Sequence, residues 1–400
     1  MGKNISKYRY TGDEKFKISK FDTADKSQVE GREQAVDEFV ENLRKINKLQ
    51  QALYAARKEG VIFVFQAMDA AGKDGVIRTV FSSLTPHGVK EYCFKVPSSE
   101  ESAHNYLWRF GPPQPAHGHI SIFNRSYYED VLVGKVHKLY KNQARADRLK
   151  DVDVIEARYK EIVNFEQFLY NNSTRVVKIF LNVSKDEQAR RFISRIDTPS
   201  KNWKVSSGDI EERKYWDEYM DAFETMVNKT STKTSPWYVV PADHKWYARL
   251  IVSRIVLQTL EEMDPQYPVL ADEEKAKMAG IRAELIKSLG NDTDLLDENV
   301  DDTFSKTENV VRDMFIEEEG TKVIKKAEKK KKKGFKMIRR MLASGYIVKN
   351  PDAIVNAVAE GMEAVDDVVP APEAEIEEAP AAEETSAQDS AEAPAAESSN

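Results

Sequence analysis

Apolar residues along this chain follow two different periods. Residues 33–60 space them three and four positions apart, which predicts an amphipathic helix with Gly60 as its C-cap. The continuous apolar run at 61–65 is typical of a strand buried on both faces within a parallel sheet. Further strands are expected at 91–96, 119–124, 176–183 and 237–240.

Segments with a helical pattern separate these strands. They are expected at 74–84, 100–110, 154–170, 185–196, 209–228 and 244–263. Strands that alternate with helices predict an α/β fold, because crossover helices cover both faces of a parallel sheet. We therefore expect a three-layer sandwich around a parallel central sheet.

Polarity divides the chain into four segments. Residues 1–30 are polar with scattered aromatic side chains, and we expect an N-terminal arm on the surface before a folded domain over 31–268. Residues 269–368 mix charged helical stretches with few aromatic residues, include the lysine-rich run 325–340, and predict a charged helical appendage. Residues 369–400 are dominated by Ala, Glu, Pro and Ser and predict a disordered acidic tail, because little apolar surface is available to offset chain entropy.

Charge and cysteine content indicate the kind of ligand and the cellular compartment to expect. The net charge is −7, but the last thirty residues carry nine acidic and no basic side chains, so the rest of the chain has a net charge of +2. Such a body can still contain a strongly basic cleft. The single cysteine, Cys93, excludes an internal disulfide and, with no secretory signal, predicts a cytoplasmic protein. No apolar run is long enough for a membrane span, so no membrane association is expected.

The stretch GVIFVFQAMDAAGKDGVIR at 60–78 predicts a strand, a loop of small residues and a helix start. This is the layout of a phosphate-binding loop, in which backbone N–H groups and a helix N-terminus bind phosphate. The pattern G-x-x-x-x-G-K-[ST] has Gly where this chain has Ala67, and Ser or Thr where it has Asp74. The carboxylates of Asp69 and Asp74 could replace the missing hydroxyl as magnesium ligands. The phosphate-binding residues expected here are Ala71, Gly72, Lys73, Asp74, Gly75 and Arg78. The alternative is an ordinary strand-to-helix turn.

A second group of polar residues lies in HISIFNRSYYEDVLV, residues 119–133. Asn124 and Arg125 come at the carboxyl end of the predicted strand, where α/β sheets bind ligands. Arg125 could hold phosphoryl oxygens through two parallel hydrogen bonds. Glu129 and Asp130 belong either to the same site or to a helix N-terminus whose dipole favours acidic residues.

A basic helix is the third feature. Ser184 and Glu187 form a capping-box pattern that predicts a helix start. The cations that follow are Arg190, Arg191, Arg195, Lys201 and Lys204. In a chain with a phosphate loop, this pattern predicts a lid over about 185–215 that closes arginines on transferring phosphates. A solvated helix with long cationic side chains is the alternative.

Five blocks of sequence, in this order, together resemble the polyphosphate kinase 2 family. They are QAMDAAGKDGVIR, FKVPSSEESAHNYLWR, IFNRSYYEDVLV, RRFISRIDTPSKNWKVSSGDIEERKYWDEYMDAFE and SPWYVVPADHKWYARLIVSRIV, and the resemblance covers about residues 13–268. It implies a P-loop kinase fold similar to thymidylate kinase, with a helical lid. It also implies phosphoryl transfer between inorganic polyphosphate and nucleotides with Mg²⁺, or alternatively Mn²⁺, in a homodimer or homotetramer. The FNRS form resembles the subgroup that acts on both nucleoside mono- and diphosphates: AMP, ADP and also GDP.

The resemblance also assigns roles by position. Asp69, Lys73 and Arg125 match catalytic positions, with Asp69 and Asp74 as metal ligands. In this mechanism Asp69 orients or deprotonates the acceptor phosphate, while the lysine and arginines neutralise the transferring group. The lid cations and Lys73 match polyphosphate-binding positions. Nucleotide binding is expected at Asn124, Tyr128 and Asp130. Ala67 departs from the glycine usual in the family.

Two other readings stay open. An ATP-dependent nucleoside monophosphate kinase would share the loop, the lid and the sheet. A protein that is not an enzyme could use the lysine-rich run to bind RNA, polyphosphate or an acidic partner. No RNA-binding motif accompanies that run, so no specific nucleic acid is expected and a solvated appendage is favoured. The acidic tail could also fold back and mask the lysines.

Overall fold

The computed structural model of this 400-residue chain describes residues 5–289, 312, 346–348 and 368–370. The chain divides into two units, residues 1–318 and 319–400. In the second unit, β7 (Tyr346–Val348) pairs antiparallel with β8 (Val368–Pro370). The lysine-rich run and the acidic tail lie outside the described residues, so the predictions for them stay predictions.

Six strands form one sheet in the first unit, in the order β1-β6-β5-β2-β4-β3. Their bounds are Arg9–Tyr10 for β1, Gly60–Ala67 for β2, Val89–Cys93 for β3, Ile120–Asn124 for β4, Thr174–Asn182 for β5 and Trp237–Pro241 for β6. Only β1 runs antiparallel to its neighbour, and the other five strands are mutually parallel. The expected α/β fold with a parallel central sheet is confirmed.

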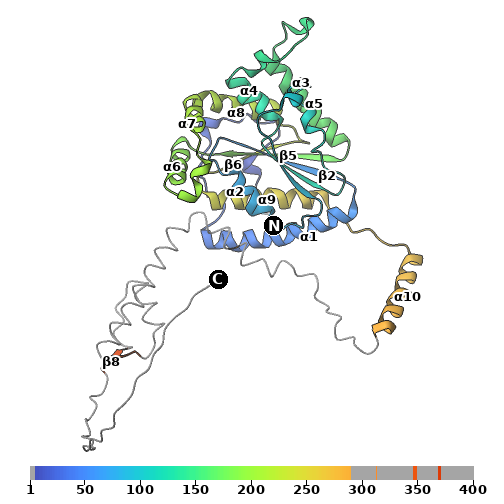
Figure 1. Ribbon diagram of the computed structural model, residues 1–400. Helices are drawn as coiled ribbons and strands as arrows, with labels where there is room; N and C mark the ends of the chain where they lie inside the picture. Colours follow the sequence, from blue (N-terminus) through green and yellow to red (C-terminus); the bar gives the residue numbers. More distant parts are fainter. Residues whose placement is uncertain (1–4, 290–311, 313–345, 349–367, 371–400) are drawn as a thin grey trace, which may run out of the picture. The chain divides into compact units, whose positions relative to one another are not determined.

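Helices cover both faces of this sheet (Figure 1). The longer helices before residue 264 are α1 (Arg32–Ala56), α2 (Lys73–Phe81), α5 (Val154–Asn171), α6 (Lys185–Ile196), α8 (Trp216–Thr230) and α9 (Lys245–Met263). A further helix, α10 (Asp272–Leu289), has no buried residue. The shorter ones are α3 (Ser99–Ala103), α4 (Val133–Val136) and α7 (Ser207–Glu212). Figure 1 shows α1 and α9 on one side of the sheet and α5 and α8 on the other, which are the outer layers of the predicted sandwich.

Two expected helix boundaries are wrong. Helix α1 ends at Ala56, and Arg57 adopts the left-handed conformation with φ 50° as its C-cap. Gly60 is instead the first residue of β2, where its N–H donates to the carbonyl of Ser173. The helix expected at 100–110 is reduced to α3 and a 3-10 turn at Trp108–Phe110, because the backbone is already extended at His104.

The described part of the N-terminal segment packs into the sheet domain. Tyr8 and Phe16 are buried in its hydrophobic core, and β1 extends the sheet by pairing with β6. Tyr8 also donates to Asp25 and shares a hydrogen bond with Tyr247 of α9. The boundary expected at residue 31 stays a prediction, but residues on both sides of it belong to one core.

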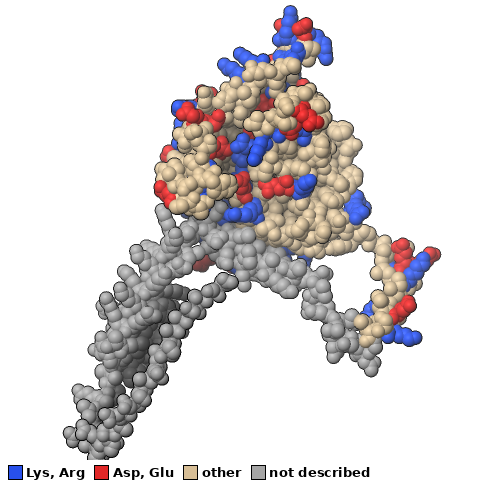
Figure 2. All heavy atoms as spheres, viewed as in Figure 1, with Lys and Arg blue, Asp and Glu red and all other residues tan. Residues whose placement is uncertain are grey.

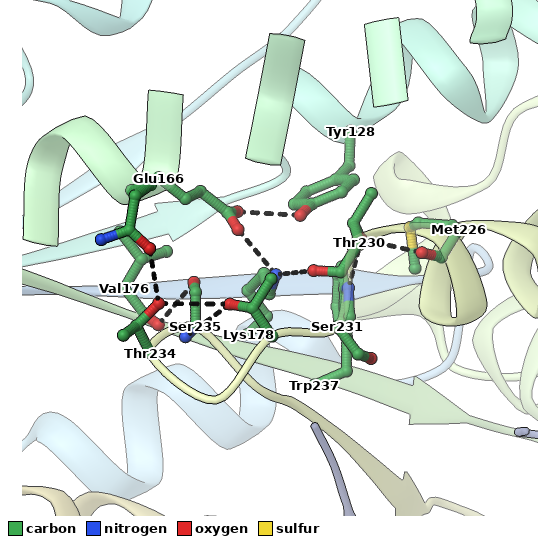
Figure 3. A network of polar contacts seen from close by, with 12 residues as sticks. Tyr128, Glu166, Val176, Lys178, Met226, Thr230, Ser231, Thr234, Ser235 and Trp237 are labelled. Atoms are coloured by element: carbon green, nitrogen blue, oxygen red, sulfur yellow. Dashed lines mark hydrogen bonds and ion pairs between the residues drawn. The ribbon is translucent and has the colours of Figure 1, made fainter. Parts of the chain in front are cut away.

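A buried polar network ties β5 to the turn that follows β4 (Figure 3). Lys178 is fully buried in β5 and donates to Glu166 of α5 at 2.7 Å and to the carbonyl of Thr230 at 2.6 Å. The same carboxylate accepts from the hydroxyls of Tyr127 and Tyr128. Both tyrosines belong to η4 (Tyr127–Val131), so the network holds in place the 3-10 turn that leaves β4.

Candidate active site

The loop between β2 and α2 carries the phosphate-binding motif. Ala67 is the last residue of β2, so an alanine fits there in an ordinary strand conformation. The left-handed residues come later, at Ala70 with φ 62° and Gly72 with φ 105°. Lys73 begins α2, and its ammonium group donates to the carbonyl of Ala67 at 2.9 Å, across the loop. The loop is therefore a tight turn closed by its own lysine.

Arg125 meets this loop from the neighbouring strand. Strands β2 and β4 are parallel and adjacent, so their carboxyl ends lie at the same edge of the sheet. Arg125 follows β4 with a left-handed φ of 66°, an uncommon conformation for a residue with a side chain. Its guanidinium contacts the Asp69 carboxylate at 2.7 Å and the Glu129 carboxylate at 3.7 Å. Asp69, Lys73 and Arg125, predicted as catalytic, thus belong to one cluster.

The cluster perturbs the protonation of its members. Burial lowers the pKa of the Lys73 ammonium, and repulsion from Arg125 lowers it further. Burial raises the pKa of Glu129, although Arg125 and Lys73 oppose that shift. Burial acts against the charge of Arg125, but Glu129 and Asp69 outweigh it and raise the guanidinium pKa. Perturbed groups of both signs around one loop are typical of a functional site.

Asp74 and Asn124 form the other side of the site. The Asn124 amide donates to Asp74 at 3.0 Å and to Glu91 of β3 at 3.0 Å. Burial alone would raise the pKa of Asp74, but the Asn124 hydrogen bond and the charge of Lys73 bring it below its usual value. Glu91 was missed from the sequence. It is paired with Ile122 in the register of β3 and β4, two residues before Asn124, and only the strand pairing reveals this.

An open cleft of about 600 Å³ extends from Asp74 between α2 and the edge strand β3. Its polar lining includes Asp74, Arg78, Glu91 and Lys204, while its apolar walls come mainly from α2 and the segment after it. Arg78 and Lys204, expected from the sequence to bind phosphate, therefore face the same space as the phosphate-loop acid.

The predicted lid is a run of short helices after β5. It contains α6, η7 (Pro199–Lys204), α7 and η8 (Arg213–Tyr215). Ser184 caps α6 by accepting from the Glu187 N–H, as predicted. The reciprocal half of the capping box is wrong, because the Glu187 carboxylate binds Arg190 and Arg191 instead, and the Ser184 N–H donates to Asp243.

The lid cations lie in different environments. The Arg190 side chain is 68% exposed, whereas Arg191 is 6% exposed and its guanidinium contacts the backbone of the phosphate loop. Lys204 lines the same cleft as Asp74, and the charges of Lys204 and Arg195 both lower the pKa of Asp74. Lys201 is exposed on η7.

Two of the three expected nucleotide-binding residues lie away from the open site. Tyr128 is fully buried, and its hydroxyl is used by Glu166, so its ring offers no face to a ligand in this structure. Asp130 pairs with the buried Arg158 of α5 at 3.3 Å, and burial raises its pKa. Only Asn124 directly contacts a phosphate-loop residue.

Carboxylates suited to a divalent cation are present on the phosphate loop and at the start of α2. Among the described residues, no group of three or more His, Cys, Asp and Glu side chains could hold a metal ion. Mg²⁺ is commonly held by one or two carboxylates together with substrate phosphates and waters, so Asp69 and Asp74 fit that pattern. Figure 2 shows acidic and basic side chains intermixed on the face in view.

A parallel sheet whose strand β2 leads into a lysine-bearing phosphate loop, with an arginine at the end of the next strand, defines a P-loop phosphotransferase. Comparisons with known proteins specify the class further. The family description "Polyphosphate kinase 2 (PPK2)" matches residues 27–268. The chain belongs to the polyphosphate kinase 2 family.

Named relatives agree with this assignment. An ADP-polyphosphate phosphotransferase of Rhodopseudomonas palustris is 43% identical over 282 residues, covering 70% of this chain and 98% of the relative. An AMP/ADP-polyphosphate phosphotransferase of Meiothermus ruber is 44% identical over 265 residues, covering 66% of this chain and 96% of the relative. The crystal structure of polyphosphate kinase 2 from Arthrobacter aurescens TC1 is similar with a TM-score of 0.63 and 36% identity, covering 70% of this chain and 98% of that one. Among the described residues, no helix combines the length and apolarity needed to cross a membrane.

Proposed function

We propose that this protein transfers phosphoryl groups between inorganic polyphosphate and nucleoside mono- and diphosphates, forming ADP from AMP and ATP from ADP. The observation that carries the proposal is the cluster of Lys73, Arg125 and Asp69 around one phosphate loop. Relatives named for AMP and ADP acceptors support the choice of nucleotides. GDP is a further acceptor of the same chemical class.

The cations and the carboxylate of the cluster have different roles. Lys73 and Arg125 stabilise the charge of the transferring phosphoryl group, because cations already fixed in position need no reorganisation when that charge develops. Asp69 orients the acceptor phosphate and accepts its proton. Arg125 holds the Asp69 carboxylate in place at 2.7 Å before the acceptor arrives.

A divalent cation completes this arrangement. Asp69 and Asp74 are the proposed ligands of Mg²⁺, with Mn²⁺ as a substitute. When bound, the metal supplies positive charge that neutralises phosphate oxygens. The hydrogen bond from Asn124 to Asp74 keeps that carboxylate ionised and oriented.

The segment 185–215 acts as a lid over the polyphosphate chain. Polyphosphate carries about one negative charge per phosphate, so its binding requires a row of cations without a base-reading pocket. Arg195 and Lys204 already act electrostatically on Asp74, and Arg190 and Lys201 are exposed on the same segment. We further propose a homodimer or homotetramer in the cytoplasm, as expected from the sequence.

The donor separates this proposal from its nearest alternative, an ATP-dependent nucleoside monophosphate kinase. Purified protein with Mg²⁺ is incubated with AMP or ADP, and with either long-chain polyphosphate or ATP as the donor. ATP formed from ADP and polyphosphate supports the proposed reaction, and ADP formed from AMP supports action on both acceptors. Transfer from ATP alone would replace the proposal with the conventional kinase.

A further inference from the structure

Helix α6 contacts the phosphate loop from the side of its carbonyl groups. Gln188 donates from its amide to the carbonyl of Asp69 at 2.8 Å. Arg191 donates from Nη1 to the carbonyls of Ala70 and Ala71, at 3.3 and 2.6 Å. Three successive carbonyls of the loop therefore accept hydrogen bonds from one helix.

The guanidinium of Arg191 has its full set of partners in this arrangement. It has five N–H groups. Nε donates to Glu187 at 2.9 Å, Nη1 donates to the two loop carbonyls, and Nη2 donates to the carbonyls of Ala242 and Asp243. Five acceptors for five donors leave none for a phosphate. Arg191 therefore does not act as the phosphate clamp that its place in the lid sequence suggests.

Binding the carbonyls determines where the loop N–H groups point. In a trans peptide the N–H is directed opposite to the carbonyl of the same unit, and no described peptide bond is cis. The N–H groups of Ala70 and Gly72 share peptide units with the Asp69 and Ala71 carbonyls, so they point away from α6. The intervening N–H, of Ala71, turns back to the Met68 carbonyl at 3.2 Å. Outward N–H groups of this kind form an anion-binding concavity.

This conformation is not one that the loop adopts without support. Ala70 has φ 62°, and a left-handed conformation costs an alanine roughly 1–2 kcal/mol. Gly72 has φ 105°, a conformation that residues with a side chain rarely adopt. Lys73 and the Ala71 N–H support the loop from within, and the hydrogen bonds from α6 are placed to support it from outside.

We propose that Arg191, assisted by Gln188, is a positioning residue that holds the phosphate loop in its anion-binding conformation before substrate arrives. The proposal deepens the proposed function and depends on it for the identity of the anion. The same hydrogen-bonded group includes the far end of the lid, because the Gln188 side-chain oxygen accepts from Arg213 of η8 at 2.5 Å.

The test uses the full chain with Arg191→Ala and Gln188→Leu, and Arg254→Ala as a matched control. Arg254 is also a buried arginine, bound to Glu38 by two hydrogen bonds between α9 and α1, and it does not contact the phosphate loop. Hydrogen–deuterium exchange of peptides covering 67–73 is followed without substrate. Steady-state rates are measured with tripolyphosphate and with long-chain polyphosphate.

Arg191→Ala is expected to speed exchange in the loop and to lower kcat about 100-fold with both donors, since small displacements of reacting groups cost rate on that scale. Gln188→Leu should show a smaller effect of the same kind. Millimolar guanidinium should restore part of the kcat of Arg191→Ala. Arg254→Ala should lose thermal stability but show the wild-type rate of loop exchange and the wild-type kcat. Added guanidinium should leave the kcat of this control variant unchanged.

Wild-type exchange and kcat in Arg191→Ala would overturn the proposal. So would a raised KM for long polyphosphate alone, which would assign Arg191 to donor binding. If Arg191→Ala does not fold, Arg191→Lys decides by the same measurements, because lysine keeps the charge but cannot span the five acceptors. If the wild type uses ATP but not polyphosphate, the proposed function fails while loop exchange still decides the role of Arg191.

Discussion

Two charged networks of this protein lie within one domain and are built on opposite principles. Around the phosphate loop, Lys73, Arg125 and Asp69 sit at the open ends of strands, and the Arg125 and Asp69 side chains are 39% and 32% exposed. In the sheet, Lys178 and Glu166 are 0% and 1% exposed, and each makes hydrogen bonds to further groups of the protein (Figure 3). The groups of the first network are partly open to solvent and can contact a ligand, whereas those of the second are buried and already paired with one another.

The difference shows how the location of a charge decides its use. A buried ion pair that loses one partner leaves an uncompensated charge, so the Lys178–Glu166 pair is tied to stability. A partly exposed pair contributes little to stability, so the Arg125–Asp69 pair is available for chemistry. Tyr127 and Tyr128 connect the two, because they donate to Glu166 from the turn that follows Arg125.

The largest effect on activity is expected from Asp69→Asn. The amide keeps the shape of the carboxylate but cannot accept the acceptor's proton, so transfer should fall by about 1,000-fold or more. The free energy of unfolding should change by less than about 1 kcal/mol, because the Arg125 pair is partly exposed. Steady-state kinetics and urea unfolding measure the two quantities. Full activity in this variant would remove Asp69 from the mechanism.

The largest effect on stability is expected from Lys178→Met. This change leaves the Glu166 charge buried without its cation and should cost about 3–5 kcal/mol of unfolding free energy. The double variant Lys178→Met with Glu166→Gln should lose less than the sum of the two single changes, as urea unfolding would show. Strict additivity of the two losses would mean that the pair is not coupled.

The pH dependence of activity tests the role of Lys73. Burial lowers the pKa of Lys73, so kcat/KM should fall on the alkaline side at a pH below the ordinary lysine value of 10.5. The sign for stability is opposite: the unfolded chain holds this proton to higher pH, so the Lys73 contribution to stability rises as pH increases through the lowered pKa. In Lys73→Arg the alkaline fall should disappear, although the rate is lower throughout. An unchanged alkaline limb in that variant would assign the titration to another group.

A smaller effect on stability than that of Lys178→Met is expected from the ion pair of Asp25 and Lys7, in which the carboxylate is largely buried and the lysine is exposed. Burial would raise the pKa of Asp25, but hydrogen bonds from Lys7 and Tyr8 outweigh it and lower the pKa to about 2. Because the folded-state pKa is depressed, this carboxylate stabilises the protein above about pH 4 and loses that effect as pH falls toward 2. Asp25→Asn should cost about 1–2 kcal/mol at pH 7, a figure reduced because the Lys7 side chain is 52% exposed. Urea midpoints of variant and wild type should converge at low pH, and a constant gap would contradict this account.

Local patterns were sufficient for the elements that bury whole strands or helix faces. The continuous apolar run of β2 and the three-and-four spacing of α1 each have one stable arrangement, so both were predictable. The end of α1 was not, because Arg57 takes the left-handed cap position and the glycine of the pattern enters the sheet. The conformation of short polar stretches such as 100–110 depends on the segments that pack against them, and local sequence patterns do not reveal which segments those are.

The sequence by itself determined the phosphate loop, its lysine and the two acids, because their chemistry depends on spacing within one strand–loop–helix unit. It also determined that Arg125 would reach the same edge, because parallel strands end together. Only the tertiary structure decided that Arg191 binds the loop carbonyls while Arg190 faces solvent, and that Tyr128 belongs to a buried network. Neighbouring residues on a helix differ in burial according to what packs against each face, and that depends on segments far apart in the chain.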